Sequence, residues 1–431
     1  MLASVKGCLH APSYWLAIKE ESIEAAYEAA WETWMPKQPS ECAVPIALTL
    51  AGFLVIAGCY GQFPEKLYRF CLQHYESNLG LGLAETLKCM KDFGDFLLDK
   101  GRYEEAEALY RKALIGRETF LGPTHPDTLT SVNSIGNMLR LKGDVEGAEM
   151  WFRRSLSGRE NSLGPEHSDT LSSINNLGML LLGSGNYEEA ELLLNRALQG
   201  KERVCGPLHP DTLMCVQNMG NLLSDLDDYE GAEVMYRRSL DGKDKVFGVG
   251  HPNTLGSASN LGIVLLTKGD YEQAEALFLR SLQGYEKVYG PNHIETRRCL
   301  FNLGTLLWNK GDLASADLAY RRELSACDTM GQDGDETTQG AFNLGRLLRQ
   351  AGKLQDAVEL LSEYASKSAT AMTVLRYNLA CYECLSGNEE HARQLVTNEL
   401  STSDDPVARK SQMLEDADFQ TIHDFIRSIP V

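Results

Sequence analysis

Residues 176–198 read NLGMLLLGSGNYEEAELLLNRAL, and this stretch decides the fold because it returns at a fixed spacing along the chain. Gly178 belongs to a series of glycines that are 42 residues apart, except that the last step is one residue shorter: Gly94, Gly136, Gly178, Gly220, Gly262, Gly304 and Gly345. An alanine follows each glycine by twelve residues, and a large apolar residue follows four residues after that. A repeat of this length is typical of solenoids and arrays.

Each repeat contains two segments with helical spacing of apolar residues. In the quoted repeat these segments are 170–182 and 187–198, where apolar residues recur three or four positions apart. Gly185 and Asn186 mark a turn between them, and Asn186 with Glu189 has the spacing of a capping box. The sequence therefore predicts tandem helix–turn–helix pairs.

Small residues at fixed positions indicate where the helices of a pair meet. Gly178 and Ala190 fall where the two predicted helices would approach each other closely. Helix axes pack roughly 8–10 Å apart, and the distance depends on the side chains at the contact. A large side chain at either position would force the helices apart.

These motifs resemble a known family. Asn-Leu-Gly followed by Gly-Asp-Tyr-Glu-x-Ala-Glu-x-Leu-Phe-x-Arg-Ser-Leu is similar to a tetratricopeptide repeat. The linker Leu-Gly-Pro-x-His-Pro-Asp-Thr and the 42-residue period resemble the kinesin light chain subtype, over about residues 83–366. The resemblance implies an all-α, right-handed α-solenoid of about nine helix pairs.

The ends of the array depart from the period. Residues 43–60 contain no charge over 18 positions, which is long enough for a membrane span. Gly52, however, lies 42 residues before Gly94, so we expect the buried first helix of a degenerate repeat. The predicted organisation is an N-terminal capping-helix region (1–42), a degenerate repeat (43–82), the array (83–368), a last degenerate repeat (369–400) and a C-terminal capping helix (401–431).

Composition narrows the classes of function. With 60 acidic and 41 basic side chains, the formal charge is -19, which argues against binding to nucleic acid or to an anionic membrane surface. Eleven irregularly placed cysteines favour reduced thiols, and the first ten residues have no apolar region of a signal peptide. We expect a cytoplasmic monomer.

No local motif predicts catalysis or a cofactor. The sequence has no G-x-S-x-G, P-loop, G-x-G-x-x-G or H-E-x-x-H pattern, so we expect a non-enzyme without cofactor or metal. Five histidines follow the period (His125, His167, His209, His251 and His293), but equivalent positions in stacked pairs are about 10 Å apart, too far for one metal ion. They are interpreted as helix-start residues. Cys381 and Cys384 form a single C-x-x-C near His391, which is a weak metal or redox signal against the alternative of buried thiols.

An asparagine series is the strongest candidate site. Its members lie two residues before the glycine of a repeat, or before the alanine that replaces it: Asn176, Asn218, Asn260, Asn302, Asn343 and Asn378. Asparagine is a mediocre helix former, so its repetition within helices calls for a reason. The resemblance implies that the first helices line a concave groove and that these amides bind the backbone of an extended peptide. The alternative is that each amide bonds the neighbouring repeat.

The repeat register adds further groove positions. Polar, uncharged residues are expected in the front half, at Asn133, Asn137, Asn175, Gln217 and Asn221. Aromatic residues are expected in the rear half, at Phe301, Trp308 and Phe342. Positive charge comes from Arg140, Arg298, Arg346 and Arg349. Because arginine suits bidentate capture of a carboxylate, we expect a protein or peptide partner with an acidic residue beside an apolar anchor.

The sequence thus predicts a non-enzymatic scaffold that binds an extended segment of a partner protein in its concave groove. Two alternatives stay open. One is a rigid assembly subunit whose convex face or caps make the contacts. The other is a cargo adaptor of the kinesin light chain type, although this sequence has no long N-terminal heptad region and carries glycine where that subtype usually carries alanine.

Overall fold

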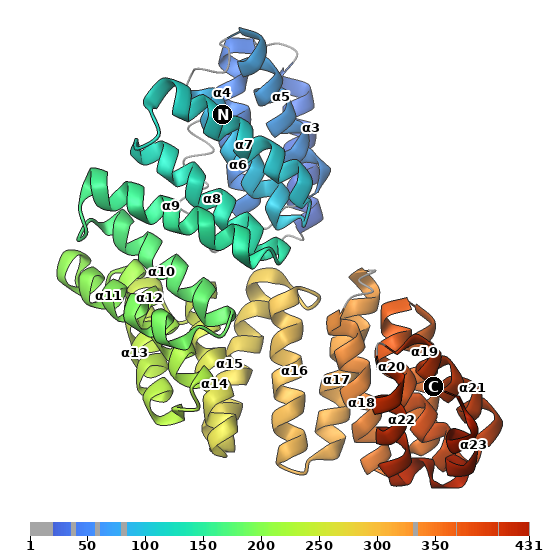
Figure 1. Ribbon diagram of the computed structural model, residues 1–431. Helices are drawn as coiled ribbons and strands as arrows, with labels where there is room; N and C mark the ends of the chain where they lie inside the picture. Colours follow the sequence, from blue (N-terminus) through green and yellow to red (C-terminus); the bar gives the residue numbers. More distant parts are fainter. Residues whose placement is uncertain are drawn as a thin grey trace. The chain divides into compact units, whose positions relative to one another are not determined.

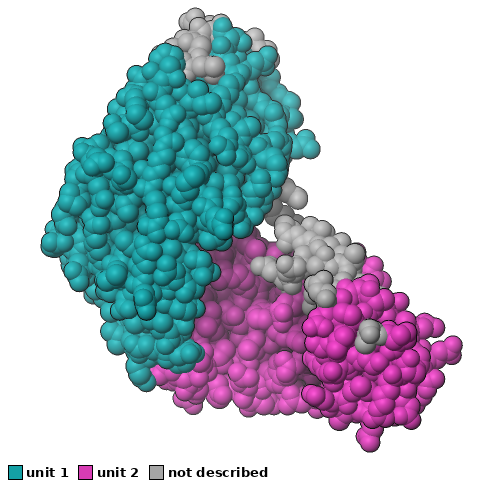
Figure 2. All heavy atoms as spheres, in the orientation of Figure 1, with its two compact units in different colours: residues 1–248 teal, residues 249–431 magenta. Residues whose placement is uncertain are grey.

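A computed structural model describes residues 20–35, 40–56, 61–78, 84–330, 335–367, 369–403 and 405–430. Within these ranges the chain forms α-helices and one 3₁₀ helix, with no strand, so the predicted all-α class is confirmed. The chain divides into two compact units, residues 1–248 and 249–431 (Figure 2). Residues 1–19 of the predicted N-terminal cap lie outside the described residues.

The described part of unit 1 contains a leading helix and five helix pairs. The leading helix is α3 (Glu20–Trp34). The pairs are α4 (Ser40–Ile56) with α5 (Gln62–Asn78), α6 (Ala84–Asp99) with α7 (Tyr103–Leu121), α8 (Pro126–Lys142) with α9 (Val145–Leu163), α10 (Ser168–Gly183) with α11 (Tyr187–Cys205), and α12 (Pro210–Asp225) with α13 (Tyr229–Phe247) (Figure 1). The second helix of each of the first four pairs also packs on the first helix of the next pair.

Unit 2 consists of four helix pairs and a C-terminal segment. The pairs are α14 (Pro252–Lys268) with α15 (Tyr271–Tyr289), α16 (Ile294–Asn309) with α17 (Leu313–Met330), α18 (Asp335–Gln350) with α19 (Leu354–Lys367), and α20 (Ala369–Ser386) with α21 (Glu389–Thr402). The C-terminal segment contains α22 (Pro406–Glu415), the 3₁₀ helix η2 (Ala417–Ile422) and α23 (His423–Ser428). Among the described residues the two units together contain nine pairs, as the sequence predicts.

Residues 43–56 of the uncharged N-terminal run belong to α4, which packs within unit 1. In α4 the side chains of Ala47, Ala51 and Leu54 are fully buried in the hydrophobic core. The helix packs against α5. The thiol of Cys71 on α5 donates a hydrogen bond to the carbonyl oxygen of Val44 on α4, with 3.5 Å between sulfur and oxygen. Among the described helices, none combines the length and apolar character needed to cross a membrane.

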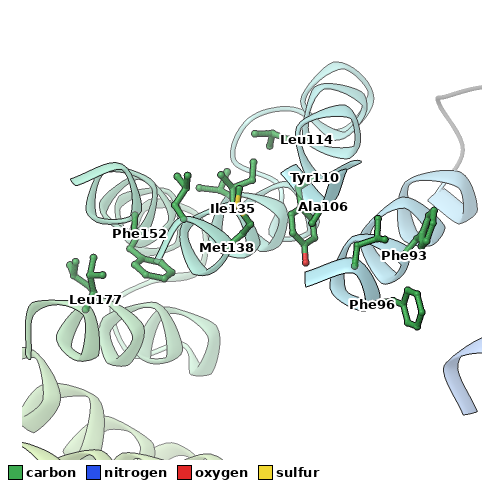
Figure 3. Packing of buried hydrophobic residues seen from close by; sticks show 14 of the residues in the cluster. Phe93, Phe96, Ala106, Tyr110, Leu114, Ile135, Met138, Phe152 and Leu177 are labelled. Carbon is green, nitrogen blue, oxygen red and sulfur yellow. The ribbon is translucent and has the colours of Figure 1, made fainter. Parts of the chain in front are cut away.

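A close contact at a glycine joins the two helices of each pair from α6–α7 to α18–α19. A Cβ atom at residue 178 would lie 2.9 Å from Cγ of Leu194, well inside normal van der Waals distance. Five of the equivalent glycines face an aromatic ring instead, so a Cβ at Gly136 would lie 2.8 Å from the ring of Phe152. Figure 3 shows Tyr110 and Phe152 packed in this core. The predicted close approach at the glycine is therefore confirmed.

The repeated histidines cap the first helices. In each of the five linkers the histidine Nδ1 accepts a hydrogen bond from the backbone N–H two residues later, at 3.2 Å. An imidazole can accept this bond only when Nδ1 carries no proton. The sequence placed these histidines at helix starts, but it did not reveal that they act as side-chain caps.

Replacing Ala190 by arginine tests the close packing of the pair. Ala190 is fully buried against the core, so Ala190→Arg places a charge where neither space nor a partner exists. We expect a loss of more than about 4 kcal/mol in the free energy of unfolding, measured by circular dichroism melting. Leu192→Arg is the matched control, because Leu192 lies on the same helix and is 72% exposed. Unchanged melting of the Ala190 variant would contradict the packing described.

The histidine caps predict a pH dependence that His293 makes testable. Burial lowers the pKa of His293, partly offset by Glu295. The unfolded chain therefore binds a proton more readily than the folded chain, and stability falls as pH drops below the ordinary value of about 6.5. His293→Asn keeps a capping acceptor that does not titrate. Between pH 7.5 and 5.5 the wild type should lose more unfolding free energy in urea titrations than this variant, whereas parallel losses would show that the cap does not titrate.

Candidate functional site

Every predicted groove residue lies on the first helix of its pair, and we call this surface the first-helix face. The predicted residues are Asn133, Asn137 and Arg140 on α8, Asn175 and Asn176 on α10, Gln217, Asn218 and Asn221 on α12, Asn260 on α14, Arg298, Phe301, Asn302 and Trp308 on α16, Phe342, Asn343, Arg346 and Arg349 on α18, and Asn378 on α20. The two units are described separately below.

In unit 1, amide side chains bond neighbouring repeats. Asn176 Nδ2 donates to Asn133 Oδ1 at 3.2 Å, so a bond joins α10 to α8. Asn218 Nδ2 donates to Asn175 Oδ1 at 2.9 Å, which joins α12 to α10. The two amide pairs occupy the same repeat positions. Each donor lies two residues before the glycine of its own repeat, and each acceptor lies three residues before the glycine of the preceding repeat. For these two asparagines the structure favours the alternative of inter-repeat bonding.

Two predicted groove residues need correction. Asn175 is 2% exposed and Asn218 is 8% exposed, so a partner cannot reach their amides. They were expected in the groove, but the packing of α12 against α10 places their side chains between the two helices. Sequence register alone could not separate a residue that faces the groove from one that faces the next first helix.

The other polar positions of unit 1 also have intramolecular partners. Asn137 Oδ1 accepts from Arg140 Nη2 at 2.9 Å, and Asn221 Oδ1 accepts from the Tyr236 hydroxyl at 2.6 Å. Gln217 Oε1 accepts a hydrogen bond from Lys243, and burial lowers the pKa of Lys243 to about 8. The first-helix face of unit 1 is therefore polar and largely bonded to itself.

A series of buried cations escaped the sequence interpretation, although it follows the same 42-residue period. Its members lie near the ends of second helices: Arg117, Arg159, Lys201 and Lys243. Arg159 Nη1 donates to the carbonyl oxygen of Asp169 at 3.0 Å and to Ser173 Oγ at 2.8 Å, so it ties α9 to the next first helix. Lys201 bonds Asp211 Oδ2 at 2.6 Å in the same manner. Arg117, Arg159 and Lys201 therefore tie their second helices to the next first helix.

In unit 2, Arg298 and Phe301 line a pocket of about 210 Å³. Arg297, Glu323 and Gln339 complete its lining. The ring of Phe301 packs edge-on against Tyr320, with centroids 5.9 Å apart, which fixes its orientation. Arg298 is exposed and pairs with Glu295 on its own helix at 3.0 Å. The pocket thus combines an aromatic wall with charged groups at its rim.

Three further predicted residues form one cluster, which we call the Arg346 cluster. The guanidinium carbon of Arg346 lies 5.2 Å from the ring centroid of Trp308 and 5.6 Å from that of Phe342. The orientation of the Trp308 ring is itself fixed, because its Nε1–H donates a hydrogen bond to Gln350 Oε1. These are cation–π distances, so both rings orient the guanidinium. Arg346 itself is exposed.

Arg346 differs from the other exposed arginines of unit 2 because it has no carboxylate partner among the described residues. Each of the others forms an ion pair with a carboxylate: Arg298, Arg321, Arg322, Arg349, Arg393 and Arg427. Arg346 forms no ion pair with any residue that the structure describes. In a chain with a formal charge of -19, Arg346 is thus a cation without a carboxylate partner in the described ranges.

Arg349 has a different role from the one that the sequence suggested. Its guanidinium makes two bonds to the carboxylate of Asp418, at 2.5 and 2.6 Å. Asp418 belongs to η2, so the chain's own C-terminal segment occupies this arginine. Among the remaining asparagines, Asn343 accepts from Gln339 at 3.2 Å, whereas Asn260, Asn302 and Asn378 are half-buried and make no side-chain hydrogen bond within the described part of the chain.

The C-x-x-C cysteines lie in the packed interior of unit 2. Cys381 and Cys384 are both buried, and burial raises the pKa of each thiol, to about 11 for Cys384. His391 bonds Glu383 Oε1 at 2.7 Å and does not join them. Cys381, Asp416 and Asp418 come within 4.8 Å of one another. Both carboxylates already have partners. Asp418 forms an ion pair with Arg349, and Asp416 accepts a hydrogen bond from the Tyr377 hydroxyl at 2.9 Å.

Comparison with known proteins identifies the repeat. The family model described as tetratricopeptide repeat matches residues 85–160, 127–203, 175–245 and 253–329, and a second model of the same repeat matches residues 301–371. Comparison with the curated proteins finds no match.

Several solved structures match part of the chain at low identity. BtubC (BKLC) from P. vanneervenii is 22% identical, and the match covers 57% of this chain and 93% of that chain with a TM-score of 0.43. A putative kinesin light chain from Podosopora anserina is 19% identical, with 47% and 96% covered and a TM-score of 0.39. The apo form of RapI is 15% identical, with 62% and 94% covered and a TM-score of 0.45.

The glycine-mediated pairs, the 42-residue period and the family match over more than half of the residues lead to one conclusion: this chain belongs to the tetratricopeptide repeat family.

Proposed function

We propose that this protein is a scaffold that binds an extended segment of a partner protein on the first-helix face of unit 2. The observation that carries the proposal is the Arg346 cluster, an exposed cation held between two rings without a carboxylate partner in the described residues. A carboxylate of a partner would supply the missing counter-charge through two parallel hydrogen bonds. Because the rings already orient the guanidinium, little conformational entropy is lost on binding.

The neighbouring pocket supports the same proposal. Its volume of about 210 Å³ is of the size of one side chain, and the ring of Phe301 forms part of its wall. Deep pockets with an aromatic wall commonly hold the anchor residue of a partner. An acidic residue on Arg346 and an apolar anchor beside Phe301 would place a partner segment along α16 and α18.

The asparagines contribute differently in the two units. In unit 1, Asn133, Asn175, Asn176 and Asn218 are engaged in inter-repeat bonds. In unit 2, Asn260, Asn302 and Asn378 are half-buried, and none of them makes a side-chain hydrogen bond with a described residue. Each amide can both donate and accept, so we assign backbone recognition of the partner to these three amides.

A second candidate function has its own support in the structure. The second helices carry an exposed apolar row at equivalent positions, with Met150 61%, Leu192 72% and Val234 62% exposed in unit 1. Cross-repeat ion pairs such as Arg153–Glu189, at 2.8 Å, neutralise charges on the same helices. Such a row suits assembly into a larger complex through the second helices.

Affinity capture with matched variants separates the two functions. Three baits are compared in extract of the native cell: wild type, Phe301→Ala with Arg346→Ala, and Leu192→Ser with Val234→Ser. Circular dichroism melting first establishes that both variants unfold at the same temperature as the wild type. We expect the Phe301/Arg346 variant to reduce recovery of partners at least tenfold, because it removes the anchor wall and the uncompensated cation.

The Leu192/Val234 variant should recover those partners as wild type does. If instead it loses the partners while the Phe301/Arg346 variant keeps them, the first-helix proposal is wrong and the assembly role is favoured.

A further inference from the structure

Cys381 and Cys384 hold positions that are accessible in the other repeats. They follow Ala380, which takes the place of the repeat glycine, by one and four residues. In the pairs from α6–α7 to α18–α19 the residue directly after the glycine is exposed or half-buried in every case: Asp95, Asn137, Met179, Asn221, Ile263, Thr305 and Arg346. The array alone would therefore leave the thiol of Cys381 accessible.

The C-terminal segment explains why the two thiols are buried instead. Cys381 is 2% and Cys384 is 4% exposed, and η2 packs against α20, the helix that carries them. Cys381 Sγ lies 3.9 Å from Oδ2 of Asp416, the residue before η2. Burial raises the pKa of both thiols, to about 11 for Cys384, where a hydrogen bond with Thr421 of η2 offsets the rise only in part. Residues 416–422 thus cover the pair.

A few side chains hold this cover in place. Phe419 is fully buried, and its ring meets Tyr377 of α20 edge-on with centroids 5.4 Å apart. Asp418 forms its ion pair with Arg349 of α18 at 2.5 Å. Local segments with few anchoring contacts open at a lower free energy than the packed elements beneath them. Opening of residues 416–422 exposes both thiols while the helix pairs stay folded.

The spacing of the two cysteines suits a bond between them. In an α-helix the Cα atoms of residues three apart are separated by about 5 Å, and disulfides bridge Cα atoms about 4.4–6.8 Å apart. The Cβ atoms must still approach each other, which requires a change in the helix backbone. Cys384 lies two residues before the end of α20, so only the last turn has to change. No other repeat from Gly94 to Gly345 has a cysteine at either position.

We propose that Cys381 and Cys384 are a redox-active thiol pair whose access to oxidant is controlled by the C-terminal segment. When η2 leaves α20, a small-molecule disulfide such as glutathione disulfide oxidises the pair. One cysteine thiolate attacks a glutathione sulfur and releases one glutathione thiolate, and the other cysteine thiolate attacks the mixed disulfide and releases the second. The cysteines lose two electrons and two protons, and the two glutathione molecules gain them.

The disulfide acts back on the cover. It changes the last turn of α20, on which η2 packs, so the oxidised chain holds residues 416–422 less firmly. A disulfide that distorts its helix is also easily reduced, so the change is reversible. The Arg346 cluster has no part in this chemistry, which therefore stands independently of the proposed function.

Disulfide formation in the full chain is the direct test. The chain is incubated with glutathione disulfide, free thiols are alkylated, and the tryptic peptide 377–393, which contains these two cysteines alone, is followed by mass spectrometry. The internal disulfide appears as the loss of two hydrogen atoms. We expect it to form at least tenfold faster with Phe419→Ala than in wild type, and to be accelerated by a smaller factor with Asp418→Asn, because both changes weaken the cover.

Two further variants serve as controls. Val407→Ala changes a residue of the same segment that is 59% exposed, so its rate should equal that of wild type. Cys384→Ser should stop at the mixed disulfide on Cys381. If circular dichroism melting shows that Phe419→Ala unfolds the pairs, Asp418→Asn carries the comparison. Equal rates in wild type and the weakened variants, or mixed disulfides on both cysteines without the internal bond, overturn the proposal.

Hydrogen exchange tests the effect of the disulfide on the cover. The backbone N–H of Phe419 bonds the carbonyl oxygen of Asp416 at 3.1 Å, so its exchange reports opening of this turn. We expect residues 416–422 to exchange at least tenfold faster in the oxidised chain than in the reduced chain, whereas α16 should exchange alike in both. Equal exchange of residues 416–422 would overturn the claim that oxidation loosens the segment.

Discussion

The contact between a glycine of the first helix and a large side chain of the second helix is the constraint on which the pairs from α6–α7 to α18–α19 depend. With no Cβ at Gly178 or Gly220, Leu194 and Tyr236 can enter the space between the helices. This contact fixes the rotation of both helices about their axes, so it decides which residues are buried and which form the first-helix face. Because the contact recurs every 42 residues, the same face is presented by each repeat.

Bonds between repeats are a second layer of organisation. Buried cations such as Arg159 and Lys201 run from one second helix to the next first helix, and amide pairs such as Asn175–Asn218 join successive first helices. In arrays of this kind each repeat touches only its neighbours, so stability is close to a sum of repeat and interface contributions. Polar residues that satisfy each other between repeats are unavailable to a partner, which explains why candidate ligand-binding residues concentrate in unit 2.

The period was sufficient to predict the helix pairs, their number and the buried glycine contact, because these depend on local pattern. The site was harder to predict. Register placed all the candidates on first helices, but the burial of Asn175 and Asn218 follows from the approach of neighbouring helices, which sequence spacing does not reveal. The pairing of Arg349 with Asp418 joins residues 69 positions apart, so it required the path of the C-terminal segment. In five linkers a histidine directly precedes the first helix, which is a signal that the sequence contains, but the role of its Nδ1 as a hydrogen-bond acceptor appears only in the geometry.

The central claim is that partners contact the first-helix face of unit 2 rather than the apolar row of the second helices. The most direct test is site-specific photo-cross-linking in the native cell, with benzoylphenylalanine at Phe342 or at Leu192 in otherwise unchanged chains. We expect a discrete cross-linked partner from position 342, with the attached partner residue next to an acidic side chain, and no such product from position 192. A partner captured only from position 192 would contradict the account.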